Sequence, residues 1–310
     1  MIPRLLTLLL ALLLTACTGG APRDASFVVP EGASVARAAQ IMEEAGAVES
    51  ASAFVRHARL FGSDTSIKPG EFEVEAGATN AEVLALLQSG RTKQRFIMIP
   101  EGMPSIMVYE RLLANPNLTG DIAVPAEGSI LPDTYAIAKN EPRAAVVARM
   151  QAAMDRAFED AWAQRSARAY PANRTQALAL ASIIEKETGQ ADERRTVAGV
   201  YTNRLSVGMR LQADPTIIYP ITQGKALGRR IRRSEIDAVN DYNTYSMAGL
   251  PIGPIANPGR ASLMAALNPA DTDYLYFVAD GSGGHVFART LAEHNANVIR
   301  WRAIRAERGI

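Results

Sequence analysis

The chain has 310 residues, 33 basic and 32 acidic side chains, and one cysteine. This length allows one or two domains with hydrophobic cores, and a net charge of +1 gives no electrostatic basis for binding nucleic acid. One cysteine excludes an internal disulfide framework, and three histidines without ligand-like spacing argue against a metal centre. We expect neither a metal nor an organic cofactor.

Residues 1–17 have the pattern of an export signal. Arg4 precedes the apolar run Leu5–Leu14, which is too short to span a bilayer, since a spanning helix needs roughly 20 residues. The run ends in Leu-Thr-Ala-Cys, which resembles the lipobox of bacterial lipoproteins, so we expect Cys17 to be acylated. An ordinary signal peptide, or a short membrane anchor with a chance cysteine, is the alternative. Residues 18–25 form a Gly/Pro-containing tether.

Residues 26–110 contain three similar segments, each with a β-prone stretch, a glycine turn and a helix start. They begin at Phe27, Phe72 and Phe96. Repeated units of this kind indicate small α+β modules, although their irregular spacing disfavours a solenoid. Accidental similarity of common β–turn–α sequence is the alternative. The residues expected to cap the three helices are Ser34, Thr79 and Ser105.

The remaining sequence predicts helices followed by a loop-rich α+β region. We expect connecting helices over 111–170, including a long amphipathic helix over 143–168, and place the main domain boundary within 110–170. A final domain over 171–310 begins with a strong helix. Near its end, 274–279 is a candidate strand, and a closing helix is expected from Thr290 to Ile304.

The helix expected over 175–188 carries a glutamate among its apolar residues. At about 100° per residue the apolar side chains form one stripe; Glu187 falls inside it, whereas Glu185 lies to the side. Burial disfavours the ionised carboxylate and raises its pKa, which is what a general acid requires. Alternatively, Glu187 reaches solvent at the helix end or pairs with Arg194 or Arg195.

Loops rich in Gly, Pro, aromatic rings and amides follow this helix. Such donors on shaped loops suit an uncharged, hydroxyl-rich ligand such as a glycan. Each residue taken alone is more often a turn or a structural side chain. The candidates for a glycan-binding groove are Gln212, Asp214, Tyr242, Asn243, Thr244, Tyr245 and Asn257.

Several long motifs occur together in this region, in the order LASIIEKET, VAGVYTNRLSVGMRLQADPTIIY, YNTYSMAGLPIGPIANPG and LYFVADGSGGHVF. This series closely resembles the YceG-like endolytic murein transglycosylase family, MltG. The upstream segments GSILPDTY and IPEGM, and the LysM-like arrangement of the N-terminal repeats, are also similar to that family. Ala213 and Asp241 depart from the residues expected there, and the lipobox-like end replaces the spanning helix common in the family.

The resemblance implies a LysM-like α+β module over 26–110, followed by a mixed α+β catalytic domain in the periplasm. It implies a lyase that cuts the MurNAc-β-1,4-GlcNAc bond inside nascent peptidoglycan strands, leaving 1,6-anhydro-MurNAc ends and limiting strand length. One glutamate acts twice, first as acid and then as base. Glu187, followed by the hydroxyl residue Thr188, matches the family pattern, with Glu185 as second candidate and partner of a nearby base.

Two other functions fit the same sequence. A catalytically silent protein could bind peptidoglycan as a scaffold, or Asp214 could activate water in a lysozyme-like hydrolase. For either enzyme we expect peptidoglycan strands as substrate, and cell-wall synthases or division proteins as further partners. The anchor is expected in the inner membrane, although Thr18 after the cysteine, not being Asp, would permit sorting to the outer membrane.

Overall fold

The computed structural model describes residues 20–62 and 66–309, so the predicted signal peptide and Cys17 lie outside the described residues. The described chain divides into two compact units. One runs to Phe96 and includes Ala136–Lys139, and the other comprises Ile97–Tyr135 and the residues from Asn140 onward. The functional roles assigned to 26–110, 111–170 and 171–310 stay predictions.

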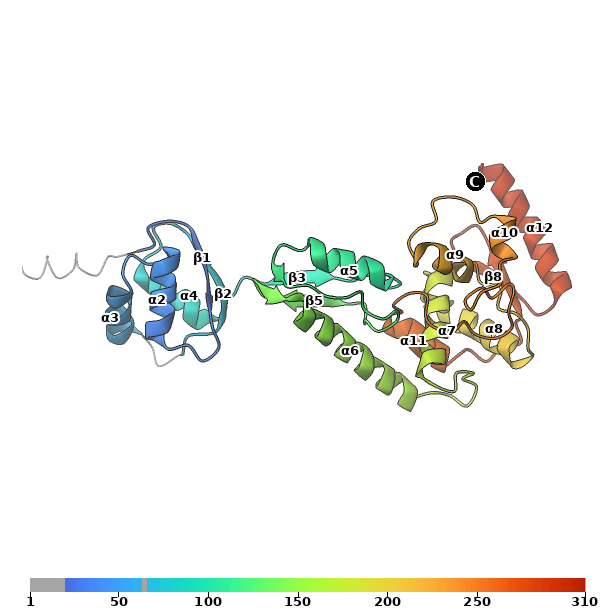
Figure 1. The fold of residues 1–310 in the computed structure, drawn as a ribbon, viewed down its shortest axis with the longest axis horizontal. Helices are drawn as coiled ribbons and strands as arrows, with labels where there is room; N and C mark the ends of the chain where they lie inside the picture. The colour runs from blue at the N-terminus through green and yellow to red at the C-terminus, as the bar shows by residue number, and fades with distance from the viewer. Residues whose placement is uncertain (1–19, 63–65, 310) are drawn as a thin grey trace, which may run out of the picture. The chain divides into compact units, whose positions relative to one another are not determined.

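The first unit is a small α+β structure (Figure 1). Its strands pair antiparallel, with Phe27 opposite Phe72 and their rings 5.9 Å apart. Both phenylalanines are buried, and the helices pack with them into one apolar core. In chain order the unit contains β1 (Ala25–Val29), α2 (Val35–Ala45), α3 (Ala51–Phe61), β2 (Gly70–Val74) and α4 (Asn80–Ser89).

The helix starts of the repeated segments are partly as predicted. Ser34 accepts a hydrogen bond from the backbone of α2, and Thr79 forms a reciprocal capping box with Glu82 at the start of α4. Ser105 was wrongly predicted as a cap. Pro104 holds that position, and the Ser105 hydroxyl instead donates to the Ala126 carbonyl at 3.2 Å. The predicted α+β class is confirmed, whereas LysM-like character stays a prediction.

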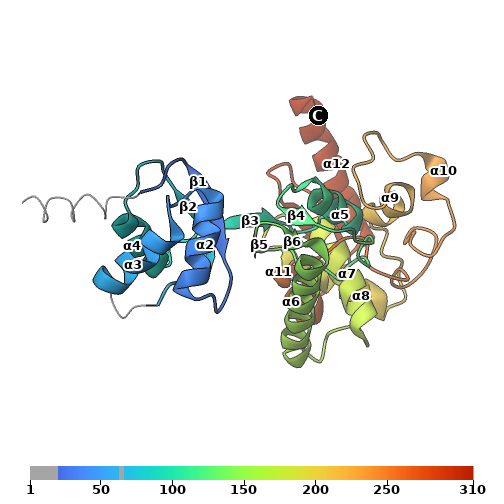
Figure 2. The ribbon, with the colours of Figure 1, turned by 60° about the vertical axis from the view of Figure 1, so that its left-hand side comes forward.

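The second unit combines helices with small paired strands (Figure 2). The division between the units passes through the paired strands β3 (Arg95–Met98) and β5 (Thr134–Ile137). The first elements that follow are α5 (Ser105–Ala114), β4 (Leu118–Thr119), β6 (Glu141–Pro142) and α6 (Arg143–Ala163). The later elements are α7 (Arg174–Glu187), α8 (Arg194–Ser206), α9 (Pro215–Thr222), α10 (Arg233–Ile236), α11 (Arg260–Leu267), β7 (Tyr276–Ala279), β8 (His285–Ala288) and α12 (Leu291–Arg308).

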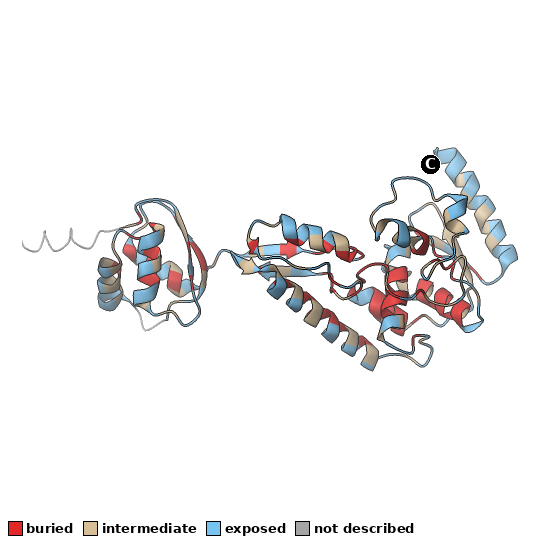
Figure 3. Ribbon diagram, viewed as in Figure 1, coloured by how far each residue is buried: buried red, intermediate tan, exposed pale blue. Residues whose placement is uncertain are grey.

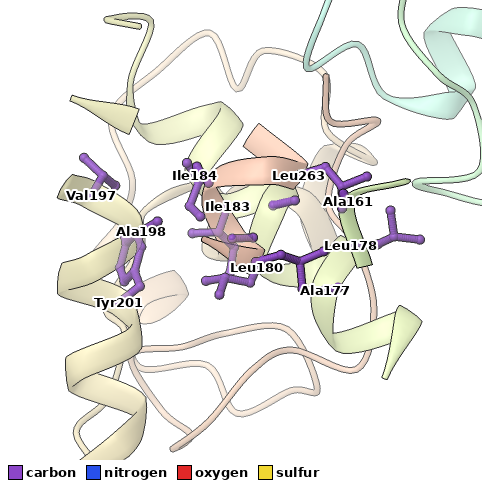
Figure 4. Close-up of a cluster of buried hydrophobic side chains, with 14 of the residues drawn as sticks. Ala161, Ala177, Leu178, Leu180, Ile183, Ile184, Val197, Ala198, Tyr201 and Leu263 are labelled. Carbon is purple, nitrogen blue, oxygen red and sulfur yellow. The ribbon is translucent and has the colours of Figure 1, made fainter. Parts of the chain in front are cut away.

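Helix α7 is the centre of this unit's core. Every residue from Ala177 to Ile184 is buried, because α8, α9 and α11 pack around the helix. In Figure 4, Leu180 and the neighbouring isoleucines lie among side chains of α8 and α11, including Tyr201 and Leu263. The predicted single apolar stripe was therefore too narrow, since a helix that is apolar on all sides is typical of a buried core element.

The helices of the second unit differ in how far they are buried. Figure 3 shows α7 largely buried and the C-terminal helix α12 largely exposed, with none of its residues fully buried. Within the described ranges, no helix has both the length and the apolar character to cross a bilayer.

Candidate active site

Glu187 is the last residue of α7, so its side chain leaves the core at the point where the helix ends. Part of the side chain remains exposed, but the Oε1 atom is enclosed and has no hydrogen-bond partner among the described residues. The next residue, Thr188, ends the helix and its hydroxyl accepts a hydrogen bond from the Gln190 backbone at 3.0 Å. Glu187 thus combines a buried carboxyl group with a position at the edge of the core.

The environment of Glu187 favours its protonated form. Burial raises the pKa of the Glu187 carboxyl to about 7, and the negative charge of Asp214 adds to this rise. A hydrogen bond from Tyr201 and the positive charge of Arg204 act in the opposite direction. A carboxyl group that is partly protonated near neutral pH can both give and accept a proton, as general acid–base catalysis requires.

Tyr201 and Arg204 reach Glu187 from α8. They are three residues apart and therefore share one face of that helix. Tyr201 is only 1% exposed, and its hydroxyl donates the hydrogen bond to the Glu187 carboxyl group. Neither residue was among the site residues predicted from the sequence. Their spacing within VAGVYTNRLS indicates that they share one helix face. Only the packing of α8 on α7 shows that this face meets Glu187.

The Arg204 guanidinium is a fixed, buried cation. Its Nε donates to the Leu275 carbonyl at 2.6 Å, and its Nη1 donates to the Leu211 carbonyl at 2.7 Å. Its Cζ lies 5.3 Å from the centre of the Tyr276 ring, at cation–π distance. Because these contacts hold Arg204 in place, its charge near Glu187 is preorganised.

Asp214 and Tyr245 belong to the same electrostatic group as Glu187. The Tyr245 hydroxyl donates to Asp214 Oδ1 at 2.6 Å. Burial, this hydrogen bond and the charges of Asp214 and Glu187 all raise the pKa of Tyr245. Asp214 is exposed, so it carries a negative charge at the open side of the group. The structure thus brings together three of the residues selected from the sequence.

Gln212 lies on the same loop as Asp214. Its side chain is exposed and its backbone has a φ of 52°, in the left-handed region that a non-glycine residue seldom adopts. Its backbone N–H donates to the Thr244 carbonyl at 3.2 Å, which ties the two loops together. The Gln212 side chain forms no hydrogen bond with Glu187, and its role in glycan binding stays a prediction.

Asn243, Thr244 and Asn257 are fully buried and bond within the protein. The Asn243 amide donates to three backbone carbonyls, and the Thr244 hydroxyl bonds the Thr216 hydroxyl at 2.9 Å. Asn257 joins distant loops by donating to the Met103 carbonyl at 2.9 Å. These side chains hold the loops in position, and their contact with a glycan stays a prediction.

Tyr242 belongs to a second aromatic group. Its ring centre lies 4.9 Å from that of Tyr219, whose hydroxyl hydrogen-bonds the largely buried carboxyl group of Glu127. Burial raises the pKa of Glu127, and hydrogen bonds from Ser105, Tyr219 and Gly128 limit the rise. Nothing in these contacts links Tyr242 to Glu187.

Glu185 has a different environment from Glu187. Its Oε2 accepts a hydrogen bond from the Gly259 backbone at 2.8 Å, and the basic group beside its Oε1 is Arg194, at 4.0 Å. Across residues 20–62 and 66–309, no three His, Cys, Asp or Glu side chains lie close enough together to hold a metal ion.

The sequence profile of the YceG-like family matches residues 27–300. The chain belongs to this family. The matched range includes Glu187 and every residue grouped with it above. It also includes all but the first few described residues of the N-terminal unit, so membership in the YceG-like family concerns both units.

Relatives of this YceG-like chain are named endolytic murein transglycosylases. One from Bacillus subtilis is 28% identical over 302 residues, covering 86% of this chain and 82% of the relative. One from Streptococcus pneumoniae is also 28% identical, covering 87% of this chain and 57% of the longer relative. A crystal structure of a YceG-like protein from Listeria monocytogenes is 27% identical and has a TM-score of 0.55, covering 88% of this chain and 98% of that one.

Proposed function

We propose that this chain is a peptidoglycan lytic transglycosylase that cuts the MurNAc-β-1,4-GlcNAc bond within glycan strands. The observation that carries the proposal is the Glu187 carboxyl group, whose pKa is raised to about 7 where α7 leaves the core. The relatives named endolytic murein transglycosylases support the choice of substrate. Cleavage inside nascent strands would limit their length during cell-wall synthesis.

In the proposed reaction Glu187 acts twice. Its carboxyl group first gives a proton to the glycosidic oxygen, and the bond between that oxygen and C1 of MurNAc breaks. The C6 hydroxyl of the same sugar then attacks C1 while Glu187 takes its proton, which forms the 1,6-anhydro ring without consuming water. The attacking hydroxyl is tethered to the sugar, so its effective concentration is high.

Tyr201 and Arg204 have a positioning role in this scheme. Between the two proton transfers Glu187 is ionised in a buried setting, which is costly unless the charge is stabilised. The Tyr201 hydroxyl and the fixed Arg204 cation both favour that ionised state. Asp214 acts in the opposite direction and keeps the pKa high enough for the first step.

A second candidate, a lysozyme-like hydrolase, rests on one observation. Asp214 is an exposed carboxylate close enough to Glu187 to raise its pKa. Glycosidases use such a second carboxylate as nucleophile or as the base for water. The third candidate, a silent peptidoglycan-binding scaffold, does not account for the raised pKa of Glu187.

The N-terminal part of the proposal concerns location and anchoring. We place the catalytic part in the periplasm, held at the inner membrane through acylated Cys17, and assign wall binding to a LysM-like module. The strand–helix–helix–strand order of the first unit supports such a module. Cell-wall synthases or division proteins would then be neighbours at the membrane. Release of the Cys17→Ala chain from membranes would support lipid anchoring, and retention would contradict it.

Mass spectrometry of the products from purified glycan strands tests the reaction. We expect 1,6-anhydro-MurNAc ends with the wild-type chain and none with Glu187→Gln. Reducing ends that carry an added water would instead establish the hydrolase. Binding of strands without cleavage by wild type or variant would favour the scaffold.

A further inference from the structure

A pocket of about 460 Å³ lies beside the candidate active site, within the second unit. Its volume falls in the range of small-ligand sites. The pocket is not lined by Glu187, but Lys186 and Pro215, the direct sequence neighbours of Glu187 and Asp214, both line it. Consecutive Cα atoms are about 3.8 Å apart, so the pocket begins within one residue of the groups assigned to catalysis.

The pocket has a largely apolar wall. Met103, Met107, Ile218 and Leu227 contribute side chains from α5, α9 and the neighbouring loops. Methionine side chains adapt to small apolar groups of varied shape. A glycan alone presents mainly hydroxyl groups, so this wall fits poorly with the sugar rings and better with a substituent that carries methyl groups.

Charged side chains of both signs also line the pocket. The Lys186 side chain is exposed, its Nζ lies 3.5 Å from the Gly102 carbonyl, and it forms no ion pair with any carboxylate of the described residues. Lys225 also lines the pocket and pairs with Glu110 at 2.5 Å. Glu101 supplies an exposed carboxyl group that can accept peptide N–H groups. Because no carboxylate in 20–62 or 66–309 pairs with it, the Lys186 ammonium group is suited to a carboxylate ligand.

We propose that this pocket binds the peptide that MurNAc carries on its lactyl group, with Lys186 pairing a peptide carboxylate. Murein peptides combine small methyl-bearing side chains with free carboxylates, which matches the apolar wall and the unpaired ammonium group. The peptide starts on the same sugar whose C1 is attacked, and three extended residues reach about 10 Å. The inference rests on the proposed function and adds that the substrate is a peptide-bearing strand.

The test compares kcat/KM for peptide-bearing strands with kcat/KM for strands stripped of peptide, using the full chain. We expect wild type to prefer peptide-bearing strands by about tenfold or more, as for one charge-assisted hydrogen bond. Lys186→Ala and Met107→Glu should bring this ratio close to one, whereas Lys186→Arg should keep most of it. Lys139→Ala, which changes an exposed lysine outside the pocket, is the matched control and should leave the ratio as in wild type.

A direct binding measurement separates this inference from the proposed reaction. Calorimetry should show that wild type binds a soluble muramoyl tripeptide more tightly than it binds peptide-free N-acetylmuramic acid. Lys186→Ala should weaken the affinity for the tripeptide about tenfold. Equal cleavage of both strand types with no such binding would overturn the pocket and leave the reaction standing. Lys186-dependent binding without cleavage of any strand would support the pocket and overturn the reaction.

Discussion

Tyr201 on α8 donates a hydrogen bond to Glu187 at the end of α7, joining the two helices at a buried carboxyl group. This bond favours the ionised carboxylate, while burial and Asp214 favour the protonated one. The balance between these effects leaves the Glu187 pKa at about 7. The contributions of Tyr201 and Asp214 can each be removed by one substitution, and the two substitutions should shift the Glu187 pKa in opposite directions.

Replacing Tyr201 with phenylalanine should raise the pKa of Glu187 further, because the change removes a hydrogen bond to the ionised form. The acid must be protonated, so activity declines as pH rises through this pKa. We expect the alkaline limb of the pH–rate profile to move up by about one pH unit, the equivalent of a charge-assisted hydrogen bond. An unmoved limb, with a normal melting temperature, would show that Tyr201 does not act on Glu187.

Asp214→Asn should have the opposite effect. The substitution removes a negative charge that raises the Glu187 pKa, so the alkaline limb should move to lower pH while cleavage continues. Asp214 makes no side-chain cap to α9, so the helix should remain intact. Asp241→Asn, in an exposed loop, is the control. Complete loss of cleavage at every pH would point to Asp214 as a chemical participant and to the hydrolase.

The raised pKa also links stability to pH. Glu187 binds its proton more tightly in the folded chain, with a pKa of about 7 against 4.5, so its stabilising contribution is fully present below 4.5 and is lost as pH rises through 7. This rise corresponds to about 3 kcal/mol. We expect the free energy of unfolding of wild type, relative to Glu187→Gln, to fall by up to that amount over this window.

Tryptophan fluorescence suits this measurement because both tryptophans, Trp162 and Trp301, lie in the same unit as Glu187. Glu44→Gln, an exposed carboxylate in the other unit, provides the comparison and should give no such pH-dependent difference. A constant difference between wild type and Glu187→Gln from pH 4.5 to 7 would mean that Glu187 titrates normally.

The sequence predicted those parts of the site that depend on local pattern. Glu187 could be selected because helical periodicity places it among apolar residues, and Asp214 and Tyr245 because they stand in polar loops that follow this helix. Tyr201 could not be selected in this way. Its hydroxyl meets Glu187 only through the packing of α8 on α7, and periodicity within one helix does not reveal its neighbours.

Because the sequence does not reveal tertiary neighbours, it also does not distinguish a buried polar residue that bonds within the protein from one that binds a ligand. Asn243, Thr244 and Asn257 lie in loops whose backbone groups are enclosed, and enclosed backbone groups need partners. An asparagine that supplies such partners has the same sequence context as one that meets a ligand. The apolar stripe of α7 was too narrow for a related reason, since the number of helices around it is set by tertiary packing.

Asn257 allows a direct test of whether a buried asparagine has a structural role or binds the substrate. Its amide donates to Met103 and Ser105, and its Oδ1 accepts the Ile130 N–H at 3.0 Å, so it ties its own loop to two other segments. Asn257→Ala would leave the buried Ile130 N–H without its partner and remove one hydrogen bond each from Met103 and Ser105. We therefore expect a loss of about 2–3 kcal/mol in the free energy of unfolding by urea. Asn295→Ala, on the exposed side of α12, should change it little. Weaker glycan binding by Asn257→Ala at unchanged stability would instead mean that this amide contacts the substrate.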